Sequence, residues 1–156
     1  MISANRTKLM LLVACISLTI LASDRVTSIQ TAAPAPLPNP VLAFIGQEPF
    51  ETAGKSFTRY KYAVENFQAY PSELFAAAPT LPPCGANTNA SRTWVDLYSQ
   101  NGKRLNGFCA LRSPADLNKI WIAFVSDEVP PSWVYIELND RQTNTKYKSN
   151  LAETVE

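Results

Sequence analysis

The sequence contains no histidine, and this absence removes several classes of chemistry. Ser-His-Asp and Cys-His catalysis need an imidazole as the base, and the usual zinc and copper sites need it as a ligand. Glycine is scarce, with 5 residues in 156, and no G-x-S-x-G, P-loop or dinucleotide-binding pattern is present. We therefore expect no cofactor, no metal site and no enzymatic activity.

An excess of charge is also missing. The chain has 14 basic and 13 acidic residues, and its basic residues do not form clusters. Proteins that bind nucleic acid concentrate positive charge on one face, because the phosphate backbone supplies most of their affinity. We expect no nucleic-acid partner.

Residues 1–28 have the pattern of an export signal. Arg6 and Lys8 supply the positive start, Leu9–Ala22 is an uncharged apolar run, and small residues allow cleavage after Ala22 or after Ser28. The apolar run is too short for a membrane anchor, so we expect no membrane span. This pattern predicts a secreted or periplasmic protein.

A second form of export is an alternative. Leu12-Val13-Ala14-Cys15 resembles the lipobox of bacterial lipoproteins, in which the cysteine becomes the lipidated first residue. The apolar run before Cys15 is very short and continues beyond it, which favours an ordinary signal in which Cys15 is lost on cleavage.

Two cysteines, Cys84 and Cys109, remain after cleavage of the signal. An exported domain folds in an oxidising compartment, so we expect these two residues to form a disulfide. Two buried thiols are the alternative. A metal site is a poor fit, because two sulfurs without a histidine or a C-x-x-C spacing make a weak ligand set.

The rest of the chain divides into a linker and one domain. Residues 29–40 alternate proline with small residues, which favours an extended polyproline II spacer. Residues 41–150 have the size of one domain, and residues 151–156 are interpreted as a tail.

Short apolar runs separated by turn residues predict an all-β domain of about seven strands, a β-sandwich or barrel. The first run ends at Gly46, and Asn101-Gly102 lies between two alternating runs, which is a strong hairpin signal. The predicted strands are Val41–Ile45, Phe57–Glu65, Thr93–Ser99, Lys103–Ala110, Lys119–Val125, Trp133–Leu138 and Thr145–Lys148.

Helical signals are slight. Ser113-Pro114-Ala115-Asp116 has a capping serine, a first-position proline and an acid at the third position, which predicts one helical turn. Tyr70–Leu74 is a second candidate, and a long loop follows between Phe75 and Arg92.

The segment Trp133–Asp140, followed by Tyr147–Asn150, resembles the closing hairpin of fibronectin type III and immunoglobulin-like domains. The likeness covers some 20 residues, and the Cys-Trp-Cys arrangement of immunoglobulin domains is absent. The resemblance implies a β-sandwich. The chain also resembles uncharacterised exported bacterial proteins, which implies a location and no activity.

Two predicted strands alternate aliphatic and aromatic residues. Their aliphatic sets belong in a sandwich core, so the opposite faces would display aromatic rings mixed with acids. Such patches are typical of interaction surfaces. The candidate ligand-binding residues are Trp94, Asp96, Tyr98, Trp133, Tyr135 and Glu137.

A purely structural role is the alternative for these rings. The aromatic face could itself be the core face, or the loop from Phe75 to Arg92 could cover it. Trp121, between Ile120 and Ile122, is expected to be mostly buried.

We therefore expect a non-catalytic binding domain at the cell envelope, with a protein or a glycan as ligand. A histidine-free hydrolase is the alternative from another class, with an acid and base pair drawn from Asp96, Glu137 and Asp140. An inhibitor of an extracellular enzyme, acting through the long loop, is a third possibility. The oligomeric state is not predicted.

Overall fold

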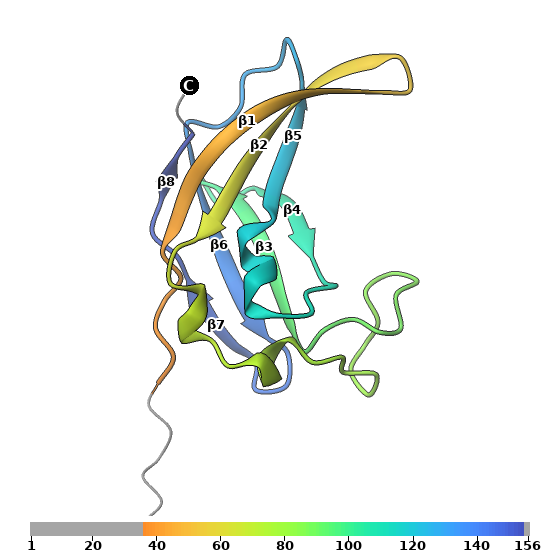
Figure 1. Ribbon diagram of the computed structural model, residues 1–156, viewed down its shortest axis with the longest axis vertical. Helices are drawn as coiled ribbons and strands as arrows, with labels where there is room; N and C mark the ends of the chain where they lie inside the picture. Colours follow the sequence, from red (N-terminus) through yellow and green to blue (C-terminus); the bar gives the residue numbers. More distant parts are fainter. Residues whose placement is uncertain (1–35, 155–156) are drawn as a thin grey trace, which may run out of the picture. The chain divides into compact units, whose positions relative to one another are not determined.

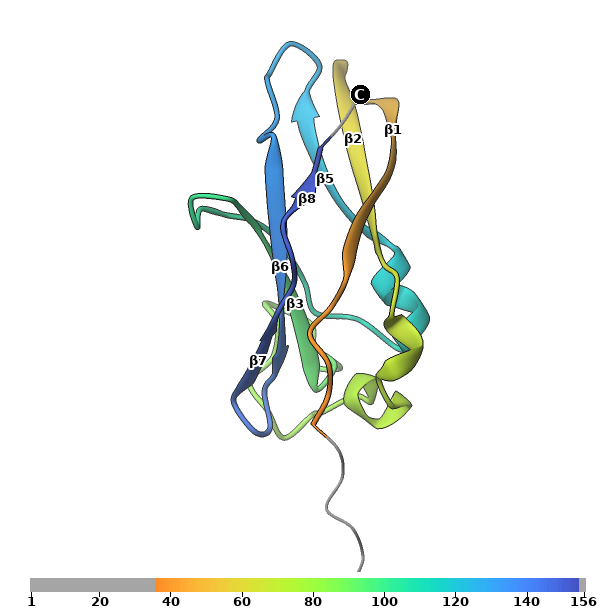
Figure 2. The same ribbon diagram turned by 90° about the vertical axis from the view of Figure 1, so that its left-hand side faces the viewer.

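The structure, a computed structural model, describes residues 36–154, which form two β-sheets of antiparallel strands packed face to face. Figures 1 and 2 show the two layers from perpendicular directions. The predicted all-β sandwich is confirmed. The predicted export signal, Cys15 and residues 29–35 of the linker lie outside the described residues.

The first sheet has three strands in the order β1-β2-β5. These are β1 (Leu42–Thr52), β2 (Lys55–Val64) and β5 (Ile120–Val125). The prediction that the first strand ends at Gly46 is wrong, because Gly46 pairs with Lys61 and the strand continues beyond a bulge at Ile45. Gly46 has a φ of +128°, which a residue with a side chain rarely adopts. Pro49 fits within β1 because this is an edge strand.

The second sheet has five strands in the order β4-β3-β6-β7, with β8 also paired to β6. They are β3 (Thr93–Ser99), β4 (Arg104–Phe108), β6 (Trp133–Asp140), β7 (Thr145–Lys148) and β8 (Ala152–Glu153). The predicted bounds of β3 and β7 match the observed ones. β8 lies in the segment interpreted as a tail, and Ala152 and Glu153 of that segment pair with β6.

The core lies between the inner faces of the two sheets. On β2, Tyr60, Tyr62 and Val64 point inward and are buried, as their alternation predicts. Facing them, the aliphatic residues of β3 and β6 have no exposed surface: Val95, Leu97, Val134, Ile136 and Leu138.

Three short 3-10 turns lie in the connections, two after β2 and one directly before β5. They are η1 (Phe67–Ala69), η2 (Ser72–Phe75) and η3 (Pro114–Asn118). η3 begins at the predicted position, and the side chain of Asp116 accepts from the backbone N–H of Ser113 at 3.2 Å in a capping box. η2 overlaps the other predicted turn.

The predicted disulfide is present and joins Cys84, in the long loop, to Cys109, which directly follows β4. The two Cα atoms are 6.2 Å apart, and the bond closes a loop with a sequence separation of 25. It therefore ties a segment without regular strands to the edge of the five-stranded sheet.

The end of the Pro-rich linker packs on the domain. Tyr70 donates its hydroxyl hydrogen to the carbonyl of Pro38 at 2.8 Å, and the side-chain amide of Asn66 donates to the carbonyl of Asn39 at 3.0 Å. Leu37 packs against the core and Pro40 is buried. Within residues 36–154, no helix has the length and apolar character needed to cross a membrane.

Candidate functional site

The six candidate residues lie together on the outer face of the five-stranded sheet. β3 and β6 are adjacent and antiparallel, with Asp96 opposite Glu137 and Tyr98 opposite Tyr135. Because the aliphatic side chains of both strands fill the core, the aromatic side chains point away from it. The alternative that the aromatic face is the core face is therefore wrong.

The centre of this face is a stack of two tyrosines beneath a lysine. The rings of Tyr98 and Tyr135 stack with centroids 5.2 Å apart, and the ammonium of Lys148 lies 4.0 Å from the centroid of Tyr135. Tyr135 is only 8% exposed. Burial, reinforced by the carboxylates of Asp96 and Glu137, raises the pKa of the Tyr98 hydroxyl. The two tyrosine rings therefore pack on each other, and Lys148 packs on Tyr135.

Trp94 is covered by Arg141, which directly follows β6. The guanidinium carbon lies 4.0 Å from the centroid of the indole. The same guanidinium donates to the carbonyl of Ser91 at 2.9 Å and to the carbonyl of Pro82. Arg141 thus links the long loop to Trp94, and the group that covers this ring follows β6 and does not come from the loop. The indole Nε1 of Trp94 is buried without a hydrogen-bond partner among the described residues.

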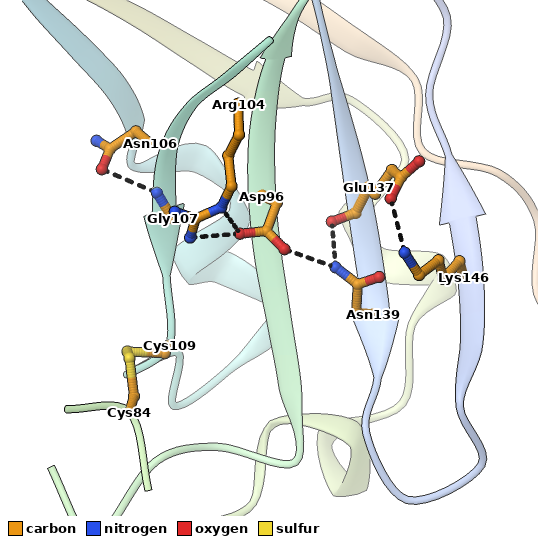
Figure 3. Close-up of polar contacts among 9 residues, drawn as sticks. All are labelled: Cys84, Asp96, Arg104, Asn106, Gly107, Cys109, Glu137, Asn139 and Lys146. Carbon is orange, nitrogen blue, oxygen red and sulfur yellow. Dashed lines mark hydrogen bonds and ion pairs between the residues drawn. A yellow bond between two sulfur atoms is a disulfide. The ribbon is translucent and has the colours of Figure 1, made fainter. Parts of the chain in front are cut away.

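Each candidate carboxylate has a cation of its own (Figure 3). Asp96 accepts from Arg104 at 2.7 Å and from the side-chain amide of Asn139 at 3.1 Å. Glu137 pairs with Lys146 at 3.3 Å, and this hydrogen bond raises the pKa of the Lys146 ammonium. The two carboxylates are opposite in register, but Figure 3 shows them turned toward different partners.

Gly107 makes room for the contact between Arg104 and Asp96. A Cβ at this position would lie 2.0 Å from Nη2 of Arg104 and 3.0 Å from Oδ1 of Asp96. The guanidinium therefore folds over the backbone of β4, where only a glycine leaves space. This role could not be predicted from the sequence, because a glycine inside a strand indicates a close approach but not the group that approaches.

The cations of this face were also missed. Four cations contact the candidate residues: Arg104, Arg141, Lys146 and Lys148. The same face has three carboxylates, those of Asp96, Glu137 and Glu153, and Glu153 lies opposite Trp133. Lys146 and Lys148 alternate along β7, which places both on one face of a strand. The pairing of β7 with β6, however, cannot be read from the alternation of residues within a single strand.

Asp140 lies at the buried end of β6 and is structural. Its carboxylate accepts from Nε of Arg92 at 2.8 Å and from Nη2 at 2.5 Å, with further bonds from Gln142 and Thr143. The hydrogen bond from Arg92 lowers the pKa of Asp140 to about 2, against the opposing effect of burial. Across residues 36–154, no group of three or more acidic or cysteine side chains is arranged to hold a metal ion.

Trp121 is more exposed than its sequence context predicts. Its neighbours Ile120 and Ile122 point into the core, which turns Trp121 to the outer face of the three-stranded sheet, where it is 37% exposed. A second aromatic position therefore faces outward from the other side of the sandwich.

Comparison of the chain with protein-family models, with curated proteins and with solved structures gives no match.

Proposed function

We propose that this domain is a non-catalytic binding module that docks an acidic partner protein on the outer face of its five-stranded sheet. The observation that carries the proposal is the excess of cations there, four against three carboxylates, around half-buried aromatic side chains. Interfaces concentrate aromatic residues and arginine, and complementary charge speeds and directs docking.

The state of the rings favours a protein over a glycan on this face. A sugar stacks on an open aromatic ring face, but Tyr98 and Tyr135 stack on each other and Arg141 lies over Trp94. The exposed edges and the charged groups around them suit the mixed polar and apolar contacts of a protein surface.

The carboxylates favour binding over hydrolysis. A glycosidase acid and base flank one bond of the substrate, with room between them for the sugar. Asp96 and Glu137 instead lie on adjacent strands and each is neutralised by its own cation. Both carboxylates are therefore engaged by neighbouring side chains of the sheet and are turned toward different partners, not toward a common substrate bond.

The fold and the disulfide support an exported location. A disulfide persists in oxidising compartments, in line with the signal expected at residues 1–28. The sandwich has its first, second and fifth strands in one sheet and its third, sixth and seventh in the other, as immunoglobulin-type domains do. This order supports the resemblance to domains common on cell surfaces.

The experiment is photo-crosslinking in the producing cells, with the full chain carrying a benzoylphenylalanine at Trp133 on the proposed face. The control position is Lys55, at the tip of the β1–β2 hairpin on the other sheet. We expect a discrete adduct with an acidic protein from position 133 and none from position 55. The adduct should disappear in the charge-reversed variant Lys146→Glu/Lys148→Glu. An absent adduct at position 133, or one that ignores the charge reversal, would overturn the proposal.

A further inference from the structure

A pocket on the opposite side of the sandwich carries a separate inference, independent of the proposed function. It has a volume of about 250 Å³ and lies where β2 and β5 meet the end of η3. Its lining residues are Arg59, Lys61, Asn118, Lys119, Ile120 and Trp121. Lys61 and Trp121 are opposite in register on β2 and β5, so the cation and the exposed ring lie side by side.

Arg59 is held in place by two rings. Its guanidinium carbon lies 4.6 Å from the centroid of Phe50 and 4.8 Å from the centroid of Trp121. One terminal nitrogen pairs with Glu48 at 3.1 Å. Its Nε is buried and has no hydrogen-bond partner in the part of the chain that the structure describes. The guanidinium is therefore fixed in position while its hydrogen-bonding capacity is only partly used.

The charge of the pocket is positive. Arg59, Lys61 and Lys119 line it, and two neighbouring carboxylates, Glu48 and Asp116, pair with them. These pairs lie at the surface and are partly exposed, and surface pairs are weak and readily shared with a competing anion. An ammonium group has three donors, so a lysine can bind a second carboxylate without leaving the first.

Two requirements follow for a ligand. The positive lining calls for an anion, and a carboxylate matches the fork of an arginine in two parallel hydrogen bonds. Trp121 is 37% exposed, and the part of its ring that Arg59 does not cover calls for a group with an apolar face that can lie against it. The volume is below the range of drug-sized pockets, so it suits a single ring.

We propose that this pocket binds an acidic sugar unit, a pyranose ring that carries a carboxylate, as in uronic-acid polymers. The ring lies against Trp121 and the carboxylate is bound by Arg59 and the two lysines. A sugar satisfies both requirements at once, because its C–H face is apolar and its carboxylate is fixed to the ring.

The test is a calorimetric titration of the protein with trigalacturonate, with neutral trigalactose as the matched ligand. We expect saturable binding of the acidic trimer that weakens with salt, and binding of the neutral trimer at least about tenfold weaker, since a charge-assisted hydrogen bond is lost. NMR should show the indole N–H signal of Trp121 shifting, with the other two tryptophan signals unchanged.

Variants separate this site from general charge effects. Lys119→Gln should weaken binding of trigalacturonate by about three- to tenfold, and Trp121→Ala should abolish it. Lys148→Gln removes one charge from the opposite sheet and should leave binding unchanged. Equal binding of both trimers, absence of saturable binding, or equal effects of Lys119→Gln and Lys148→Gln would overturn the proposal. None of these results bears on the docking of a protein on the other sheet.

Discussion

Tyr98 and Tyr135 lie opposite each other on β3 and β6, and their rings stack on the outer face of the five-stranded sheet. The next residues along the same strands, Leu97 and Ile136, also lie opposite each other but on the inner face, with no exposed surface. One pair of strands therefore supplies both the core and the candidate interface, and substitutions can separate the two roles.

Replacing Tyr98 with alanine should leave the fold intact. The substitution removes a surface stack, which contributes about 1 kcal/mol beyond simple burial, so we expect a loss of about 1–2 kcal/mol in the free energy of unfolding. Urea denaturation followed by circular dichroism measures this loss, and Tyr98→Phe, which keeps the ring, is the control. A variant that fails to fold would show that Tyr98 belongs to the core.

Replacing Ile136 with alanine should be far more costly. Its side chain is fully buried, and its removal leaves a cavity between the sheets, so we expect a loss of about 2–5 kcal/mol. The same urea titration compares this variant with Tyr98→Ala. A smaller loss for Ile136→Ala than for Tyr98→Ala would contradict the assignment of the two faces.

Alternation along single strands was enough to predict the core. Val95 and Leu97 follow a period of two, and so do Val134, Ile136 and Leu138; the inward direction of both sets is confirmed. The disulfide could also be predicted, because only two cysteines follow the predicted signal.

Features that depend on neighbours far apart in sequence could not be predicted. The contact of Lys148 with Tyr135 needs the register of β6 with β7, and the contact of Arg141 with Trp94 needs the path of the loop. The bulge next to Gly46 could not be foreseen either, because a glycine ends a strand or bends it equally well.

Reduction of the Cys84–Cys109 disulfide should destabilise the domain without unfolding the core at 25 °C. Closing a loop of this length restricts the unfolded chain by about 3 kcal/mol, while neither half-buried cysteine belongs to the core cluster. The free energy of unfolding of Cys84→Ser/Cys109→Ser, measured against the oxidised protein, checks this value. An unchanged stability would mean that the loop is already held by other contacts, such as those of Arg141.

Acid should weaken the fold through Asp140. Its pKa in the folded state is about 2, below the ordinary value of 3.8, because Arg92 stabilises the charged form. This lowered pKa stabilises the folded state by about 2 kcal/mol, at 1.36 kcal/mol per unit of pKa. The full contribution is present above pH 4 and is lost as the pH falls toward 2.

Urea titrations of the wild type and of Asp140→Asn test this role of Asp140. They are run between pH 6 and about pH 2, because the carboxyl group titrates only in the acid range. The asparagine variant should be less stable at pH 6, and the difference between the two proteins should shrink as the pH falls. A difference that stays constant with pH would show that the charge of Asp140 does not stabilise the fold.

The most direct test of the docking face is the salt dependence of its affinity for the protein captured at Trp133. The dissociation constant is measured by calorimetry from 50 mM to 300 mM NaCl for the wild type and for Lys146→Glu/Lys148→Glu, as screening grows over roughly this range. Our account predicts that salt weakens the wild-type complex, and that charge reversal weakens it by about tenfold or more at low salt. An affinity that is independent of salt, or equal in the two proteins, would contradict it.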